Sequence, residues 1–336
     1  MQFADAVSAF AAGYFSTCKR STKTQIAYKI DLAQMAVYVG PATEVCSIEP
    51  ECLEAWATAL RSMGYASSSI RRKFATARVF FAYWVRKGTL EKSPLWRLRL
   101  DLVRERVLPR NLSPEDATRL IEGVWRRLLT KPSADTGPSD PYFLRLRDVA
   151  ALEILFATGI RVGELVTLKI ADWREEDKAL TVKGKGARQR LAFLPDDRSL
   201  KAVQMYLARR RTMSCDHDHL FLNASGSAIS TQGIARIVAT TAKDAGVTAK
   251  VTPHMIRHTV ATLLLRYGAD IRIVQEVLGH ASIVTTQRYT HVAKEHLIAA
   301  LHARHPNHYL KIHWWSKERP LNGMTTSDIN NGGYRV

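Results

Sequence analysis

One proline-bounded stretch divides this chain of 336 residues. From Pro94 to Pro114 the sequence is PLWRLRLDLVRERVLPRNLSP, which is rich in arginine and contains prolines that interrupt helices and strands. Because a chain of this length can bury two ordinary cores, we expect a linker here between two domains. The expected boundaries are 1–105 for a helical N-terminal domain, a linker to about 111, 112–310 for a second domain, and 311–336 for a flexible tail.

The sequence of the first domain predicts helices and no strands. The expected helices are Phe3–Phe15, Thr22–Tyr38, Ile48–Met63 and Ser67–Lys87. In the last of these, apolar side chains recur at the spacing of one helix face, which predicts that this face is buried. The members of that face are Ile70, Phe74, Ala77, Phe81 and Trp84.

Four basic residues are expected outside that apolar face. They are Arg71, Arg72, Lys73 and Arg78. A cationic face on a helical domain can lie along a DNA backbone, and it can equally be a solvated surface. We treat these four residues as candidate DNA contacts.

The second domain begins at a capped helix, where Ser113 is a good N-cap and Pro114 suits the first helical position. A long apolar helix is expected at Tyr142–Thr158, and helices return after Asp197. Between them, ALTVKGKGARQRLAFLP has two beta-prone segments around a glycine-containing turn, which predicts a hairpin. HLFLN at 219–223 is a candidate short strand. The predicted fold class is mainly α with a small antiparallel β-sheet in the second domain (α+β).

The chain carries 49 Lys and Arg against 31 Asp and Glu, a net charge of +18. Such an excess favours a polyanionic partner, and nucleic acid is the leading candidate, although a merely basic protein is the alternative. Apolar runs stop short of the ~20 residues that span a bilayer, and the N-terminus lacks a signal-peptide pattern. We therefore expect no membrane partner and a location in the cytoplasm. The four cysteines form no CxxC pair, which fits a reducing compartment.

Two segments in the middle of the chain could contribute to a reactive site. ATGIRVGEL places Arg161 just after Gly159, at a helix break where a side chain can leave the packed surface; pairing with Glu164 is the simpler alternative. KGKGARQR places Lys185 between glycines at the hairpin tip. This segment lacks the GxxxxGK[ST] pattern and does not enter a helix, so we exclude ATP binding there.

Two later segments add further candidates. In TPHMIRHT, Thr252 is expected to cap a helix that carries His254 and Arg257 three residues apart, at an end that favours anions. In LGHASIVTTQRY, a glycine is expected to end the preceding helix and to display His280, and Tyr289 follows. The ordinary alternatives are a histidine at a helix start whose hydrogen bonds are already made, and a tyrosine whose ring is buried and whose hydroxyl is hydrogen-bonded.

Taken together, these candidates are two arginines, one lysine, two histidines and a tyrosine, with no compact carboxylate or Cys/His cluster that would hold a metal. Two guanidiniums can neutralise the charge that develops on an attacked phosphodiester. Lysine and histidine can exchange protons with the attacking and leaving oxygens, and a cationic site makes a tyrosine of pKa near ~10 a better nucleophile. The set is complete for phosphoryl transfer without metal or cofactor.

In order and spacing, these four segments resemble those of the tyrosine recombinases, the phage-integrase and Xer-like group, from about Phe3 to Pro306. The resemblance implies a catalytic domain that joins the helical domain in a C-shaped clamp around DNA. It implies a phosphate site of Arg161, Lys185, His254, Arg257 and His280, with Tyr289 as the nucleophile. Glu164 would orient Arg161, and Lys183 and Arg188 would contact DNA beside the hairpin tip.

The resemblance also implies the reaction and the assembly. Tyr289 would form a 3′-phosphotyrosyl bond, Lys185 would protonate the leaving 5′-oxygen, and strands would be exchanged through a Holliday junction. Partners would be double-stranded DNA with inverted half-sites and three further protomers, identical or from a related recombinase, joined by exchange of a C-terminal helix. The apolar face of that helix would hold Ala293, Leu297, Ala300 and Leu301, or it would pack on its own domain.

Several alternatives remain open at this point. The biological task could be integration or excision of a mobile element, resolution of cointegrates, or Xer-like resolution of chromosome or plasmid dimers. A type IB topoisomerase shares the phosphate chemistry, and a non-catalytic DNA-binding protein shares the basic surface. The loop from Lys131 to Pro141 is longer than in compact Xer-like members, and the tail beyond His308 has no counterpart in that pattern.

Overall fold

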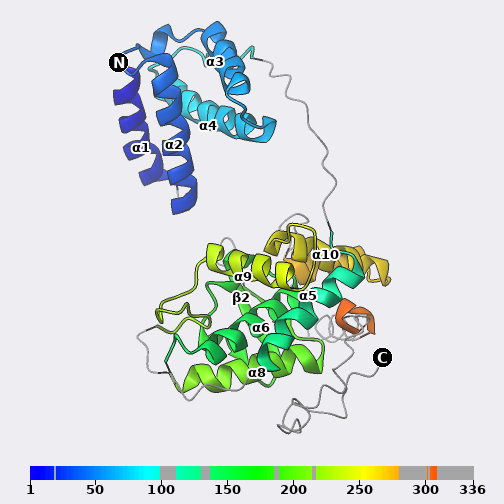
Figure 1. Cartoon of the computed structure of the whole chain (residues 1–336). Helices are drawn as coiled ribbons and strands as arrows, with labels where there is room; N and C mark the ends of the chain where they lie inside the picture. Colours follow the sequence, from blue (N-terminus) through cyan, green and yellow to red (C-terminus); the bar gives the residue numbers. More distant parts are fainter. Residues whose placement is uncertain are drawn as a thin grey trace. The chain divides into compact units, whose positions relative to one another are not determined.

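The computed structural model describes the ranges 1–18, 20–98, 111–129, 137–184, 189–213, 217–279, 301 and 303–308. The chain divides into two compact units, Met1–Val107 and Leu108–Val336 (Figure 1). Most of the expected linker and the whole expected tail lie outside the described ranges. No described helix is both long and apolar enough to cross a membrane.

The described part of the first unit is helical, as predicted. Its elements are α1 (Phe3–Thr17), α2 (Thr22–Val39), the 3-10 helix η1 (Val45–Ser47), α3 (Pro50–Ser62) and α4 (Ser67–Arg86). The third helix begins at Pro50, two residues later than expected, because proline favours the first helical position, where its missing N–H is not needed.

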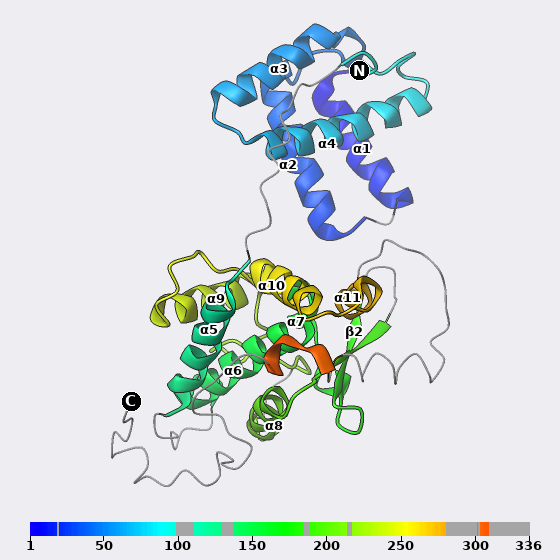
Figure 2. The same ribbon diagram turned by 90° about the vertical axis from the view of Figure 1, so that its right-hand side faces the viewer.

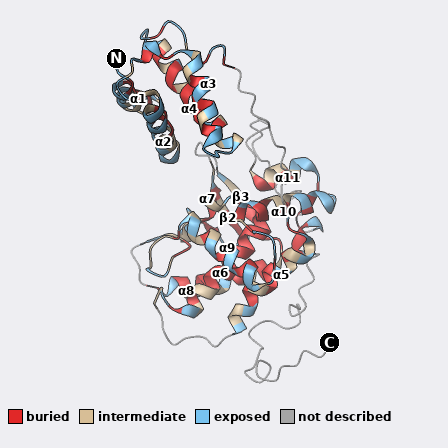
Figure 3. Ribbon diagram, turned by 45° about the horizontal axis from the view of Figure 1, so that its top comes forward, coloured by how far each residue is buried: buried red, intermediate tan, exposed pale blue. Residues whose placement is uncertain are grey.

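Aromatic side chains form the centre of the first unit. Phe10 stacks on Tyr14 with ring centroids 4.8 Å apart and meets Phe80 edge-on at 5.4 Å. The predicted apolar face of α4 is buried, which confirms that prediction (Figure 3). Burial of this face fixes the roll of α4 and exposes its opposite side.

The structure contradicts the expected exposure of one basic residue of α4. Lys73 is only 2% exposed, and its ammonium donates to Asp31 at 3.2 Å and to Gln34. Asp31 of α2 is itself 1% exposed and also accepts from Arg72 and from Thr76. A buried carboxylate needs hydrogen-bond donors and a positive charge beside it, and Lys73 supplies both to Asp31 in the interior. The prediction of Lys73 as a DNA contact is therefore corrected to a structural role.

The second unit contains most of the elements. They are α5 (Pro114–Arg126), η2 (Arg127–Leu129), α6 (Pro141–Thr158), α7 (Val162–Leu165), η3 (Ile170–Asp172), β1 (Trp173–Arg174), β2 (Ala179–Lys183), β3 (Gln189–Phe193), α8 (Asp197–Arg211), α9 (Thr231–Asp244), α10 (Pro253–Arg266), α11 (Ile271–Leu278) and η4 (Pro306–His308). The predicted caps are present: Ser113 accepts from the N–H of Asp116 at 3.0 Å, and Thr252 accepts from that of Met255 at 3.2 Å.

Helix α6 forms the centre of this unit and is buried throughout its second half (Figure 3). It contacts α5, α8, α9 and α10. The acidic side chain in its second half, Glu153, is fully buried and accepts from Arg198 and from the Trp125 indole, each at 2.6 Å. These contacts fix the position of the helix, which matters because the candidate site residue Arg161 lies three residues beyond its end.

The predicted hairpin is present. Strands β2 and β3 pair antiparallel with Val182 opposite Arg190, and β1 pairs on the other side of β2 to give a sheet of order β1-β2-β3. The candidate strand at 219–223 is wrong: this segment forms isolated bridges, His219 with Lys169 and Leu222 with Ala228. Its apolar side chains are buried in the helical core, so an apolar run alone indicated a strand where no long partner strand is described.

Candidate active site

The first predicted site segment lies where α6 ends. Gly159 has φ of +58° and closes the helix in the left-handed conformation, after which Arg161 becomes the N-cap residue of the short helix α7. Glu164 accepts from the backbone N–H of Arg161 at 2.9 Å and from its Nη1 at 3.0 Å. The two alternatives for Arg161, a side chain that leaves the packed surface and a pair with Glu164, are therefore both present. Arg161 pairs with Glu164 while its side chain stays 47% exposed.

Arg257 reaches the same place from α10. Its side chain is buried, and it donates from Nη1 to the Gly159 carbonyl at 2.8 Å and from Nη2 to the Leu278 carbonyl at 2.7 Å. Arg161 donates from Nη2 to the next carbonyl along the chain, that of Gly279, at 3.2 Å. Two guanidiniums from distant segments thus meet at adjacent peptide oxygens at the C-terminal end of α11, in the region where Figure 2 shows α7, α10, α11 and β2 together.

The charges at this point influence one another. Burial, and then the positive charge of Arg161, lowers the pKa of the Arg257 guanidinium to about 10. Arg257 therefore keeps its proton at neutral pH. Partial burial would raise the pKa of Glu164, but hydrogen bonds from Arg190 and from the Arg161 backbone lower it below its ordinary value. The carboxylate is therefore ionised and shared between two arginines.

His254 lies one turn before Arg257 on α10 and is exposed. Its Nε2 is 2.9 Å from Nε2 of His258, so one ring donates to the other. Burial, followed by the charges of His254 and Arg257, lowers the pKa of His258. A neutral His258 can accept a hydrogen bond from a protonated Nε2 of His254, which leaves His254 on the surface one turn from Arg257.

The hairpin contributes a residue that sequence reasoning missed. Arg190 of β3 donates to both carboxylate oxygens of Glu164, at 2.9 and 3.3 Å. No local pattern marks this pair, because the partners lie 26 residues apart. Lys183, a predicted DNA contact on β2, is exposed, with its ammonium 3.7 Å from Asp172.

The structure thus brings together Arg161, Glu164 and Arg257, with His254 one turn before Arg257 on α10. The predicted residues Lys185, Arg188, His280 and Tyr289 lie outside the described residues. Of the predicted contacts in the first unit, Arg78 is exposed and Arg72 is 49% exposed while paired with Asp31. Within the described ranges, no group of three or more His, Cys, Asp or Glu side chains is arranged to hold a metal ion.

Two family models match the chain. The phage integrase family matches residues 128–296, and the N-terminal SAM-like domain of phage integrases matches residues 7–88. The tyrosine recombinase XerC of Thermodesulfovibrio yellowstonii is 35% identical over 292 residues, which cover 85% of this chain and 91% of that protein. The tyrosine recombinase XerD of Listeria monocytogenes is 35% identical over 293 residues, which cover 85% and 93%.

Solved structures are similar as well. The XerH site-specific recombinase bound to a palindromic difH substrate matches with a TM-score of 0.64 and 26% identity, over 82% of this chain and 78% of that chain. A lambda integrase dimer bound to a COC′ core site matches with a TM-score of 0.64 over 88% and 77% of the two chains. Its 16% identity supports a shared fold only.

Proposed function

The chain belongs to the phage integrase family of tyrosine recombinases, whose members are site-specific recombinases that cleave and rejoin DNA, and we propose that Tyr289 is its nucleophile and that Arg161 and Arg257 hold the scissile phosphate. Lys185, His254 and His280 complete the site in this proposal. Residues 112–310 form the catalytic domain, and residues 1–105 form a helical domain that binds the core of the DNA site.

One observation carries the assignment of the phosphate site. Arg161 and Arg257 meet at the adjacent carbonyls of Leu278 and Gly279, directly before His280 in the chain. An attacked phosphodiester gathers negative charge on its non-bridging oxygens, and two preorganised guanidiniums stabilise that charge at little reorganisation cost. The half-exposed Arg161 side chain can turn from a carbonyl toward a phosphate without unfolding any element.

The chemistry follows from this arrangement. The Tyr289 phenolate attacks phosphorus, an O–P bond to tyrosine forms, and the bond to the 5′-oxygen breaks. Lys185 supplies the proton to that leaving oxygen, and a basic group of the site takes the phenol proton. Because the phosphotyrosine keeps the bond energy, a 5′-hydroxyl from a second duplex reverses the step without ATP, metal or cofactor. Strands are exchanged through a Holliday junction.

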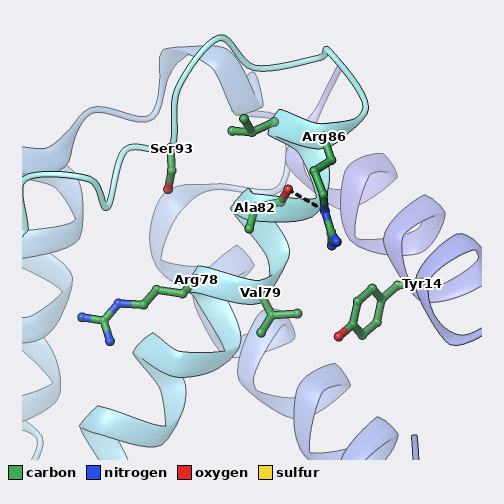
Figure 4. A pocket seen from close by; sticks show the side chains of 7 residues that line it. Tyr14, Arg78, Val79, Ala82, Arg86 and Ser93 are labelled. Carbon is green, nitrogen blue, oxygen red and sulfur yellow. Dashed lines mark hydrogen bonds between the residues drawn. The ribbon is translucent and has the colours of Figure 1, made fainter. Parts of the chain in front are cut away.

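The exposed side of α4 provides backbone contacts to DNA in this proposal. Arg78 and Arg86 flank an open hollow of about 580 Å³ over Val79 and Ala82 (Figure 4). The small side chains between the two arginines leave room for a phosphate backbone to approach the helix. The other proposed contacts are Arg71, Arg72, Lys183 and Arg188.

The proposed substrate is a double-stranded site with inverted half-sites, bound by four protomers on two duplexes in the cytoplasm, in association with the nucleoid. Exchange of the C-terminal helix links the protomers, which are identical or include a related recombinase. Of that helix's apolar face, Leu301 lies in the described residues and is buried in the core of its own unit, so exchange requires this side chain to leave that core. A type IB topoisomerase and a non-catalytic binder are disfavoured, because relatives at 35% identity are named recombinases.

A capture experiment tests this function against all the sequences of a genome in one reaction. The protein is incubated with genomic duplex fragments, the reaction is stopped with detergent, and DNA attached to protein is sequenced. We expect a single sequence family with inverted half-sites. Its location distinguishes the tasks: the ends of a mobile element indicate integration and excision, and a single chromosomal or plasmid site indicates dimer resolution. Absence of any protein-linked DNA from a folded preparation that binds DNA contradicts the proposal.

A further inference from the structure

Resting on the phosphate site proposed above, we propose that Arg190 is a positioning residue for strand cleavage. It neutralises Glu164 and thereby leaves the positive charges of Arg161 and Arg257 available to the scissile phosphate. Arg190 itself does not touch the DNA in this proposal. The inference joins the β-hairpin to the two arginines through contacts that the structure describes.

Arg190 is held firmly in place. It lies on β3 opposite Val182, and its side chain is 17% exposed, against 47% for Arg161. Its Nη2 and Nη1 bond the two oxygens of Glu164 at 2.9 and 3.3 Å. This bidentate pairing matches the planar geometry of guanidinium and carboxylate, so it fixes both partners.

Gly279 provides a second contact. A Cβ built on this residue would lie 2.8 Å from both Cζ and Nε of Arg190. The guanidinium therefore packs directly against the backbone at the end of α11, where φ of Gly279 is +63°. The same glycine offers its carbonyl to Arg161. Arg190 thus supports the backbone to which Arg161 is bonded.

The balance of charge gives this packing a function. The described centre contains three guanidiniums, of Arg161, Arg190 and Arg257, and one carboxylate, of Glu164. With Arg190 paired to the carboxylate, two positive charges remain for an incoming phosphate. Without it, Glu164 would hold Arg161 more strongly and repel the phosphate, since opposite and like charges act strongly in a partly buried site.

The test compares single and double variants of the full chain on a nicked duplex that carries the captured site. Arg190→Ala should slow cleavage about 10- to 100-fold, because small misplacement of binding groups has effects of that size, while DNA affinity changes about twofold or less. Glu164→Gln removes the unpaired charge, so the double variant Glu164→Gln with Arg190→Ala should cleave about tenfold faster than Arg190→Ala alone. Arg174→Ala is the matched control, since Arg174 lies on β1 of the same sheet and pairs with Asp177 in the turn that follows.

The outcomes separate this inference from the function on which it rests. Cleavage at the wild-type rate by Arg190→Ala, or a folded double variant no faster than Arg190→Ala, overturns the positioning role, because purely structural damage would not be relieved by a second substitution. If Arg161→Ala also cleaves at the wild-type rate, the phosphate site itself is wrong. Loss of cleavage by Arg161→Ala with normal cleavage by Arg190→Ala leaves the site intact and rejects only the inference.

Discussion

The Arg257 guanidinium is fixed by two backbone carbonyls that belong to different helix ends. Its position is therefore determined before any phosphate binds, and its burial strengthens its interaction with developing charge. A lysine could not repeat this geometry, because it lacks the planar pair of donors. In the proposed site the residue combines a structural and a catalytic role, which predicts a characteristic pattern of effects on substitution.

Replacing Arg257 by alanine should lower the rate of DNA cleavage about 10²- to 10³-fold, with a much smaller change in DNA affinity. It should also lower the free energy of unfolding by about 1–3 kcal/mol, because the carbonyls of Gly159 and Leu278 lose their donors. Single-turnover cleavage and urea unfolding measure the two effects. Arg266→Ala, on an exposed part of the same helix, is the control, and equal cleavage rates for the two variants would refute the assignment.

Lys73 and Arg78 lie on one helix and should behave in opposite ways. Lys73→Met should lower the stability of the first unit by about 3 kcal/mol, because it leaves the buried Asp31 with weaker pairing. Arg78→Ala should leave stability within about 0.5 kcal/mol and reduce the salt dependence of DNA binding by about one phosphate contact. Thermal unfolding and binding at several salt concentrations test both. A stable Lys73→Met with weakened DNA binding would reverse our correction.

Sequence reasoning succeeded at single residues where the relevant partner is local. The pairing of Arg161 with Glu164 spans three positions and was among the expected alternatives. Lys73 and Arg190 have partners 42 and 26 residues away, so neither role could be inferred from spacing. Long-range charge pairs depend on how helices and hairpin pack, and a helical period contains no information about that packing.

At the scale of elements, two helix ends position the site. Gly159 caps the end of α6 and Gly279 caps the end of α11, both with positive φ, and the arginines bind the carbonyls found there. A Cβ at Gly159 would lie 2.5 Å from Cδ2 of Leu278, so α6 and α11 approach each other through this glycine. The two ends therefore form one packed unit.

Gly159→Ala should be clearly more destabilising than Gly246→Ala. Both positions have positive φ, of +58° and +70°, so both variants lose about 1 kcal/mol from backbone strain. A Cβ at Gly246 meets nothing within 4 Å, whereas at Gly159 it overpacks against Leu278, which adds about 1–3 kcal/mol. Urea unfolding of the two proteins compares them directly. Equal losses would show that α6 and α11 are not tightly packed there.

The short element around η4 should respond to pH. His305 is fully buried, and its Nδ1 accepts from the backbone N–H of Asn307, whose side chain donates to Asp196 at 2.7 Å. Burial lowers the pKa of His305 to about 4, although Asp196 opposes that shift. An exposed histidine titrates near ~6.5, so the open segment binds a proton that the docked segment does not, and docking weakens as pH falls from about 6.5 to about 4.

Hydrogen exchange of residues 303–308 measures this effect. After correction for intrinsic rates, the opening free energy should fall by on the order of 2 kcal/mol between about pH 7 and about pH 5. The same measurement on His305→Gln removes the contribution of this residue and retains those of other groups. Asp196 is one of these: burial opposes the shift, but Arg198 and the Asn307 side chain lower its pKa, which also weakens docking as pH falls. An identical pH response in both proteins would exclude His305 as its source.

At the scale of the whole molecule, most helices and strands of both units could be predicted from the sequence. Helices with strong caps and one apolar face were found within a few residues of their expected ends, because capping and amphipathic burial are local properties. The strand expected at 219–223 failed because strand formation depends on a partner elsewhere in the chain. Four segments from Gly159 to Tyr289 were assigned to one site by resemblance, and the described contacts of Arg161 and Arg257 join residues from three of them.

The net charge of +18 favours binding of the whole chain to DNA. Counterion release makes such binding strongly dependent on salt, but it does not produce cleavage. In our proposal the chemical step depends on the small group of residues around the end of α11, together with Tyr289. Binding and cleavage should therefore be separable by substitution.

The most direct measurement follows attachment of protein to a nicked duplex that carries the captured site, on a denaturing gel. Wild-type protein should form a covalent adduct, and peptide mapping should locate the DNA on Tyr289. Tyr289→Phe should bind the duplex with unchanged affinity and form no adduct. An adduct that persists in Tyr289→Phe, or wild-type protein that binds the site and never becomes linked to it, would contradict the account.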